Sequence, residues 1–196
     1  MFIQVIQGKT SQPDELRTLA ESWQNEGRIG SVGYLGGTHG VTDDGDYLGV
    51  VRFTSREDAM ANSGRPETHA FAEKMGALME GPVQFHDCGD VTEFLDGGSD
   101  DAGFVQVISG HLDDPTRAKE MLADTGDLRE MRPEIIGGTF AISDEGTYFQ
   151  TVYFTDEASA RKGEQTEPPE EVRAEMESMM AGATFHDLHH PWFSTA

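Results

Sequence analysis

The sequence predicts an α+β protein that contains two tandem copies of one βαββαβ module. The first observation is a repeated apolar stretch, which reads FIQVIQG at 2–8 and FVQVISG at 104–110. The second is a longer block, GGTHGVTDDGDY at 36–47, which is matched by GGTFAISDEGTY at 137–148. The third is the tripeptide Phe-His-Asp, which occurs at 85–87 and again at 185–187. Because all three blocks repeat at a nearly constant offset and in the same order, we expect a duplication rather than chance similarity.

The offset also sets the predicted domain boundaries. We expect module one at 1–91, an acidic, glycine-bearing linker at 92–102 and module two at 103–196. A chain of 196 residues with 36% hydrophobic residues can bury a substantial core.

Hydrophobic periodicity, together with glycine, proline and capping residues at the boundaries, predicts the elements of the first copy in order. The strands are expected at 2–8, 32–42, 46–53 and 83–88. A first helix should begin at Pro13, carry apolar residues at a spacing of three and four, and end at Gly27. A second, short helix should begin after Ser55, which suits an N-cap, and a longer third helix should run from Pro66 to Gly81.

The order βαββαβ is that of a ferredoxin-like unit, an antiparallel sheet with helices on one face. The Asp-Asp-Gly at 43–45 supplies the turn chemistry of its central hairpin, and the second copy repeats the order as far as Leu188. The other face of each sheet would be bare. We therefore expect the two modules to pack sheet to sheet as a pseudo-dimeric α/β barrel within one chain, and we leave further oligomerisation open.

Composition narrows the classes of partner. The chain has 36 acidic and 14 basic residues and a formal net charge of −22, so nucleic acid and anionic membranes are poor partners. The start of the sequence lacks the basic and then apolar order of a signal peptide, and Cys88 is the single cysteine. We expect a cytoplasmic protein whose partner is a small molecule.

One stretch of the first copy resembles a known family. It runs from VRFTSREDA at 51–59 through Asn62 to PETHAF at 66–71. It is similar to the antibiotic biosynthesis monooxygenase-like proteins of the dimeric α/β-barrel superfamily, which share a Ser-x-Glu-x-Ala helix start followed by histidines. The sequence keeps the helix start, His69 and Phe71. It departs from the family in having Phe53 in place of a tryptophan and Asn62 near the place of the first histidine.

The resemblance implies two alternative functions. One is a cofactor-independent monooxygenase that acts on an aromatic or polyketide-like substrate. The other is a non-catalytic module of the same fold that binds a ligand or serves in a stress response. The resemblance implies no cofactor for either function.

Differences between the copies favour a site in the first one. His39, Arg52, Asn62 and His69 correspond to Phe140, Tyr153, Gly163 and Glu170. A neutral histidine can accept a phenolic proton, so we predict His69 as the catalytic base and Asn62 as its catalytic partner. The predicted substrate-binding residues are His39, Arg52, Phe53 and Phe71. The alternative is that these differences are surface changes without consequence.

Two repeated polar positions have competing interpretations. Gln4 and Gln106 lie on an apolar strand face, where they either line a cavity or satisfy their amides within the fold. His86 and His186 are either structural histidines or part of a ligand set, but three or four converging metal ligands are hard to find. We therefore predict no metal site.

Overall fold

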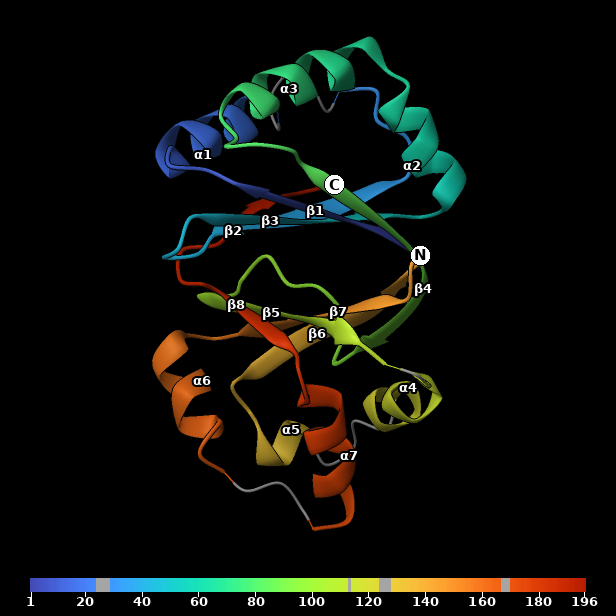
Figure 1. Cartoon of the computed structure of the whole chain (residues 1–196), viewed down its shortest axis with the longest axis vertical. Coiled ribbons are helices and arrows are strands. Elements are labelled where there is room, and N and C mark those ends of the chain that lie inside the picture. Colours follow the sequence, from blue (N-terminus) through green and yellow to red (C-terminus); the bar gives the residue numbers. More distant parts are fainter. Residues whose placement is uncertain (24–28, 113, 124–127, 167–169) are drawn as a thin grey trace. The chain divides into compact units, whose positions relative to one another are not determined.

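The computed structural model describes residues 1–23, 29–112, 114–123, 128–166 and 170–196. The chain forms two compact units, the first built from 1–89 together with 191–196 and the second from 90–190. Each unit is an antiparallel sheet with helices on one face (Figure 1).

The first unit contains most of the N-terminal half of the chain. In chain order its elements are β1 (Phe2–Lys9), α1 (Pro13–Ser22), β2 (Tyr34–Val41), β3 (Asp46–Phe53), α2 (Arg56–Ser63), α3 (Pro66–Ala77), the first part of β4 (Gln84–Phe94) and β9 (Trp192–Ser194). The strands lie in the order β4-β1-β3-β2-β9. The predicted hairpin turn is present, since the Gly45 N–H donates to the Thr42 carbonyl over 2.9 Å.

The second unit repeats this arrangement. Its elements are the rest of β4, β5 (Phe104–His111), α4 (Thr116–Ala123), α5 (Leu128–Met131), β6 (Ile135–Ser143), β7 (Thr147–Phe154), α6 (Glu157–Gly163), α7 (Glu170–Met180) and β8 (Thr184–Leu188). The strands lie in the order β8-β5-β7-β6-β4.

Strand register confirms the duplication. Gln4 pairs with Val51 on one side and Asp87 on the other, and Gln106 pairs with Val152 and Asp187 in the same way. Both second strands of the modules, β2 and β6, also shift register at the same point, between Tyr34 and Gly36 and between Ile135 and Gly137. The predicted α+β fold with two tandem ferredoxin-like modules is therefore confirmed, and the sheet-to-sheet packing of the modules stays a prediction.

Helix caps explain where the short helices begin. The Ser55 side chain accepts a hydrogen bond from the Asp58 N–H at the start of α2, and Asp156 accepts one from the Ser159 N–H at the start of α6. α1 and α3 each have proline in their first turn, where a missing N–H costs nothing. The predicted end of the first helix, Gly27, lies outside the described residues.

The structure differs from the predicted domain ranges at both junctions. β4 does not stop at Cys88 but continues to Phe94, so the range 92–102 begins inside a strand. The residues 191–196, predicted as the end of module two, belong to the first unit through β9. Each unit thus gains an edge strand that the βαββαβ pattern does not contain.

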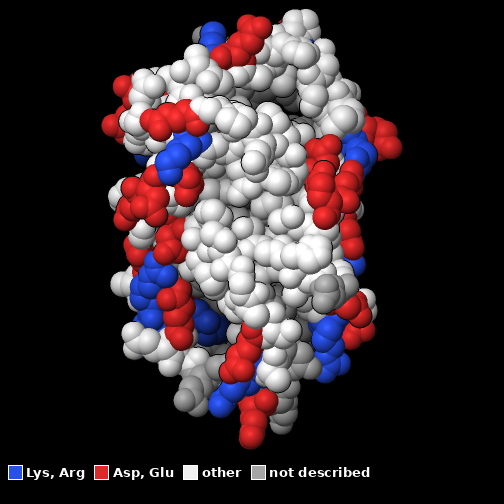
Figure 2. Space-filling view, in the orientation of Figure 1, with Lys and Arg blue, Asp and Glu red and all other residues white. Residues whose placement is uncertain are grey.

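Acidic side chains are spread over the surface rather than gathered in one segment. In Figure 2, Asp and Glu lie mainly along the margins of the visible face, with fewer Lys and Arg among them. No helix among the described residues is both long and apolar enough to cross a membrane.

Candidate functional site in the first unit

A cavity of about 350 Å³ opens inside the first unit. Its wall comes from the sheet strands β1, β2, β3, β4 and β9 and from the three helices that cover the sheet (Figure 1). Most of the lining side chains are apolar or aromatic, namely Ile6, Leu16, Ala20, Trp23, Tyr34, Tyr47, Val51, Phe53, Phe71, Ala72, Met75 and Phe85. The polar ones are Gln4, Ser31, His39, Asn62, Ser63, Thr68, His69 and Ser194.

Strand alternation decides which side chains reach the cavity. Successive residues of a strand point to opposite faces of the sheet. In β3, Tyr47, Val51 and Phe53 share the face that lines the cavity, whereas Leu48 and Val50 are buried without lining it. The cavity therefore lies on the helix-covered face of this sheet.

Four polar side chains form a hydrogen-bonded chain in the cavity wall. The His39 Nδ1 lies 2.9 Å from the Tyr47 hydroxyl, and its Nε2 lies 3.2 Å from the Ser194 Oγ. The Ser194 hydroxyl is in turn hydrogen-bonded to the Tyr34 hydroxyl. We call these residues, Tyr47, His39, Ser194 and Tyr34, the polar chain. These side chains form a hydrogen-bonded polar cluster in a cavity wall that is otherwise largely apolar.

Burial keeps the polar chain uncharged. Desolvation lowers the pKa of His39 to about 4, so its imidazole is neutral at physiological pH. Desolvation is also the main reason why the pKa of Tyr47 is raised, with a smaller contribution from the nearby Tyr34. At neutral pH each of these groups can therefore both donate and accept a hydrogen bond.

The C-terminal strand β9 completes this wall. It pairs antiparallel with β2, with Thr38 opposite Phe193 and His39 opposite Trp192. The Trp192 ring stacks on the His39 ring at a centroid distance of 6.3 Å and an interplanar angle of 16°. Sequence reasoning missed both Trp192 and Ser194. The repeat offered a signal. Phe94 follows the first Phe-His-Asp at about the same distance as Ser194 follows the second, so a strand segment could be expected after both.

Three of the predicted substrate-binding residues line the cavity. They are His39, Phe53 and Phe71, and Phe71 packs on Trp23 at a ring-centroid distance of 4.8 Å. Arg52 does not line it. Arg52 is adjacent to Phe53 in β3 and so points to the opposite face, where its Nη2 would lie 2.8 Å from a Cβ added to Gly36. Within this unit its guanidinium cannot reach a ligand in the cavity.

Asn62 lines the cavity, but its side-chain amide is hydrogen-bonded to the backbone. Its amide Nδ2 donates to the carbonyls of Val32 (2.6 Å) and Asp58 (2.8 Å), while its Oδ1 accepts from the Val32 N–H (3.1 Å). An amide has two N–H donors, and both are used here. The arrangement ties α2 to the segment before β2, so Asn62 has no donor left for a developing enolate.

His69 lies on α3 at the edge of the cavity. It is among the lining residues, and its side chain is exposed. It is therefore accessible both to a ligand in the cavity and to bulk water, unlike His39, which lies deeper against the sheet.

The repeated glutamines are satisfied by the repeated aspartates. Gln4 Nε2 donates to Asp87 Oδ1 over 2.9 Å, and Gln106 Nε2 donates to Asp187 Oδ1 over the same distance. Gln4 also lines the cavity, so both interpretations apply to it.

The repeated histidines have partners on neighbouring strands. His86 Nε2 lies 2.9 Å from Gln7 Oε1, and His186 Nε2 lies 3.5 Å from the Ser109 Oγ. In the part of the chain that the structure describes, no group of three His, Cys, Asp or Glu residues could hold a metal ion.

At the equivalent place in the second unit, the described side chains are apolar and buried. Phe140 occupies the place of His39 and stacks on Tyr148 at 5.4 Å, as His39 stacks on Tyr47 at 6.3 Å. Phe140 is 0% exposed and Phe94, from β4, is 4% exposed, and both belong to the core of this unit. The two copies therefore differ in this region, because the first places polar side chains at a cavity where the second places buried apolar ones.

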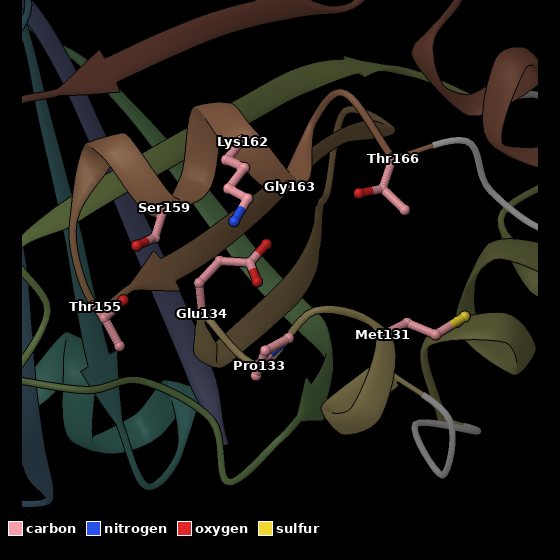
Figure 3. Close-up of a pocket in the computed structure, with 8 residues that line it drawn as sticks. All are labelled: Met131, Pro133, Glu134, Thr155, Ser159, Lys162, Gly163 and Thr166. Atoms are coloured by element: carbon pink, nitrogen blue, oxygen red, sulfur yellow. The ribbon is translucent and has the colours of Figure 1, made fainter.

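A depression of about 440 Å³ lies in the second unit, between α6 and the segment before β6 (Figure 3). It is lined by Met131, Pro133, Glu134, Thr155, Ser159, Lys162, Gly163 and Thr166. Gly163 corresponds to Asn62, so the depression lies where Asn62 ties the first unit together. Glu134 is paired there with Arg132, at 2.5 Å.

Comparisons with known proteins agree with this fold. No family model matches the sequence, and no curated protein matches it. A protein from Fusobacterium nucleatum that is proposed to be a monooxygenase superposes with a TM-score of 0.76 and 11% identity, over 99% of this chain and 94% of its own. An anthrone oxidase-like protein gives 0.67 and 12%, over 100% and 94%.

A third solved structure is also similar over most of this chain. It is a ferredoxin-fold protein from Listeria monocytogenes related to antibiotic biosynthesis monooxygenases, with a TM-score of 0.52 and 10% identity, over 96% of this chain and 94% of its own. At such low identity these similarities concern the fold alone. The chain thus has the tandem ferredoxin-like fold of antibiotic biosynthesis monooxygenase-like proteins, as the sequence resemblance implied.

Proposed function

We propose that the first unit binds a small aromatic or polyketide-like molecule in its cavity and oxidises it as a cofactor-independent monooxygenase. The observation that carries the proposal is the cavity of about 350 Å³, whose apolar and aromatic wall surrounds a single polar chain. Ligand pockets for small molecules are typically of this size and character, with a few polar groups that fix orientation. The anthrone oxidase-like neighbour supports an aromatic ketone as the substrate class.

The proposed chemistry oxidises an activated CH₂ group to a carbonyl. A base removes a proton from the CH₂ group, and the resulting enolate passes electrons to dioxygen. One oxygen atom stays in the product as the new carbonyl oxygen. The other leaves as water together with the two hydrogens of the CH₂ group, so no external reductant is needed. An enolate is stabilised by hydrogen-bond donors near its oxygen, which the polar chain can supply.

His69 is the base in this proposal. It lines the cavity and is accessible to water, so a proton that it accepts can be exchanged with solvent. Its counterpart in the second copy, Glu170, lies at the start of α7 and is exposed. The second unit lacks the polar chain, so the proposal assigns it no catalytic role.

The test compares His69→Ala with Glu170→Ala. Oxygen consumption and product formation are measured with anthrone, and labelled dioxygen follows the transferred atom. We expect His69→Ala to reduce turnover about 100-fold or more, as loss of a general base commonly does, while Glu170→Ala changes it little. Thermal unfolding of both variants should first show an intact fold. Equal turnover in wild type and His69→Ala would remove His69 from the mechanism, and no turnover in the wild type would remove the enzyme proposal.

A non-catalytic ligand-binding module is the second candidate. Two observations favour it. Both N–H donors of the Asn62 amide are hydrogen-bonded to backbone carbonyls, and Phe53 occupies the position at which the family has a tryptophan. This candidate predicts that aromatic ligands bind without any oxygen consumption.

A further inference from the structure

Gln4 lies in the sheet that forms the floor of the first unit's cavity. It stands in β1, directly opposite Val51 of β3 and Asp87 of β4. Residues directly opposite each other in an antiparallel sheet point to the same face. Val51 lines the cavity, and so does Phe85, which shares the face of Asp87 in β4. The Gln4 side chain therefore reaches the cavity from the middle of the sheet, with the Asp87 carboxylate beside it.

The Asp87 carboxylate fixes the direction of the Gln4 amide. Gln4 Nε2 donates to Asp87 Oδ1 over 2.9 Å. A carboxylate only accepts hydrogen bonds, so it faces the NH₂ group of the amide and not the amide oxygen. An amide turned the other way would place two acceptors against each other. Gln4 Oε1 therefore points away from Asp87.

Gln4 Oε1 is an acceptor that the fold leaves available. Among the described residues, the bond to Asp87 is the only hydrogen bond of the Gln4 side chain. Gln4 is half-buried and lines the cavity. A ligand in the cavity can therefore supply the hydrogen-bond donor for this oxygen.

In the second unit, the equivalent pair is covered by charged side chains of α6. Gln106 Nε2 donates to Asp187 Oδ1 and also lies 3.5 Å from Glu164 Oε1, and Gln106 is 7% exposed. Arg161 forms ion pairs with both Asp187 and Glu164. The amide of the second unit is thus held within a network of the fold itself.

The first unit lacks this cover. Met60 and Ser63 of α2 stand at the two corresponding positions. The Ser63 hydroxyl donates to the Ala59 carbonyl over 3.0 Å, and no hydrogen bond joins α2 to Gln4 in the described part of the chain. The loss of the charged cover leaves the Gln4 amide open on the side of the cavity.

We propose that Gln4 is a specificity-determining residue of the cavity and selects aromatic ligands that carry a hydroxyl group. Its Oε1 accepts a hydrogen bond from that hydroxyl, and Asp87 is a positioning residue that keeps the oxygen turned away from itself and toward the ligand. The ligand class is therefore phenols and hydroxylated aromatic ketones, in preference to the corresponding ethers. This inference rests on the proposed function in that both place the ligand in the same cavity, but it requires no oxidation.

Calorimetric affinities for α-naphthol and its methyl ether test the role of Gln4. The two probes share one ring system, and only α-naphthol can donate a hydrogen bond. A net hydrogen bond should make the wild type bind α-naphthol roughly 2- to 10-fold more tightly than the ether. Gln4→Met keeps the length of the side chain and should remove this preference by weakening α-naphthol binding alone. Gln106→Met is the matched control in the second unit and should keep the preference.

Asp87→Asn tests the positioning role with a nearly isosteric change, which also keeps the inference testable should Gln4→Met fail to fold. An asparagine amide can accept or donate, so the Gln4 amide becomes free to turn its NH₂ group toward the ligand. The preference for α-naphthol over its ether should fall. The affinity for α-tetralone, which only accepts hydrogen bonds, should rise roughly 2-fold or more. A purely structural role of Asp87 would not produce this gain.

The outcomes separate this inference from the proposed function. Equal affinity of the wild type for α-naphthol and its ether, or an unchanged preference in folded Gln4→Met, would overturn the role of Gln4 and leave an aromatic site in the cavity. If folded Asp87→Asn binds all three probes like the wild type, the positioning role is wrong. If the wild type binds none of the probes, the ligand site itself is wrong and the inference falls with it.

Discussion

His39 and its counterpart Phe140 show how one position can have different surroundings in two modules of the same fold. It lies between the Tyr47 and Ser194 hydroxyls and under the ring of Trp192, while its counterpart Phe140 lies in an apolar core. Burial without a charged partner among these contacts lowers its pKa to about 4. The imidazole therefore serves as a neutral hydrogen-bonding group. A cationic imidazole at physiological pH would be destabilised by the loss of its hydration.

This neutral histidine should make the protein sensitive to acid. The pKa of His39 is about 4 when folded and about 6.5 when unfolded, so between these values the unfolded chain binds more protons. Stability should fall as the pH drops from about 6.5 to 4, by at most about 3 kcal/mol from this group. His39→Gln stays neutral and should lose this component. Urea unfolding of both proteins at several pH values checks it, and parallel pH profiles would show that His39 is not buried in this way.

Arg52 illustrates the limit of residue-level prediction from sequence. Comparison of the copies indicated His39, Asn62 and His69, and the family resemblance indicated Phe53; all four line the cavity, while their binding or catalytic roles stay predictions. It could not assign a face to Arg52, since a shift of one residue in a strand reverses the direction of the side chain. Alternation from Phe53 along β3 would have excluded Arg52 from the cavity.

At the scale of elements, the edge strands explain why one module is hollow. β9 adds to β2 in the first unit and brings Ser194 and Trp192, while the end of β4 adds to β6 in the second and brings Phe94. The helices and central strands could be predicted from the sequence, because hydrophobic periodicity, helix caps and turn residues mark them locally. β9 did not, because it is short and its partner strand lies about 150 residues earlier, so no local signal marks the pairing.

Removal of β9 should open the site. A chain ending at His190 loses Trp192 and Ser194, which are 8% and 5% exposed in the intact protein. Loss of a buried tryptophan costs about 3–5 kcal/mol, so we expect a comparable fall in unfolding free energy and loss of α-naphthol binding. The control is a chain that lacks only the exposed residues Thr195 and Ala196. A protein that ends at His190 and keeps wild-type stability and affinity would contradict the role given to β9.

At the scale of the whole molecule, duplication has allowed the two units to diverge. The net charge of −22 and the dispersed acidic surface suit a protein that avoids nucleic acid and anionic membranes (Figure 2). The second unit retains the register, the bulge and the Gln–Asp pair of the first, but Phe140 and Phe94 lie where the first unit has His39 and Ser194. Function should therefore be confined to the first unit, with one ligand bound per chain.

Calorimetric titration of α-naphthol against the wild type and a His39→Phe, Ser194→Phe double variant tests this claim most directly. The variant gives the first unit the two phenylalanines, Phe140 and Phe94, that fill the second, and thermal unfolding should show that it is folded. The account predicts one site per chain in the wild type and at least a 10-fold loss of affinity in the double variant, since the two rings occupy the ligand's place. Two equivalent sites per chain, or unchanged affinity in the folded double variant, would contradict it.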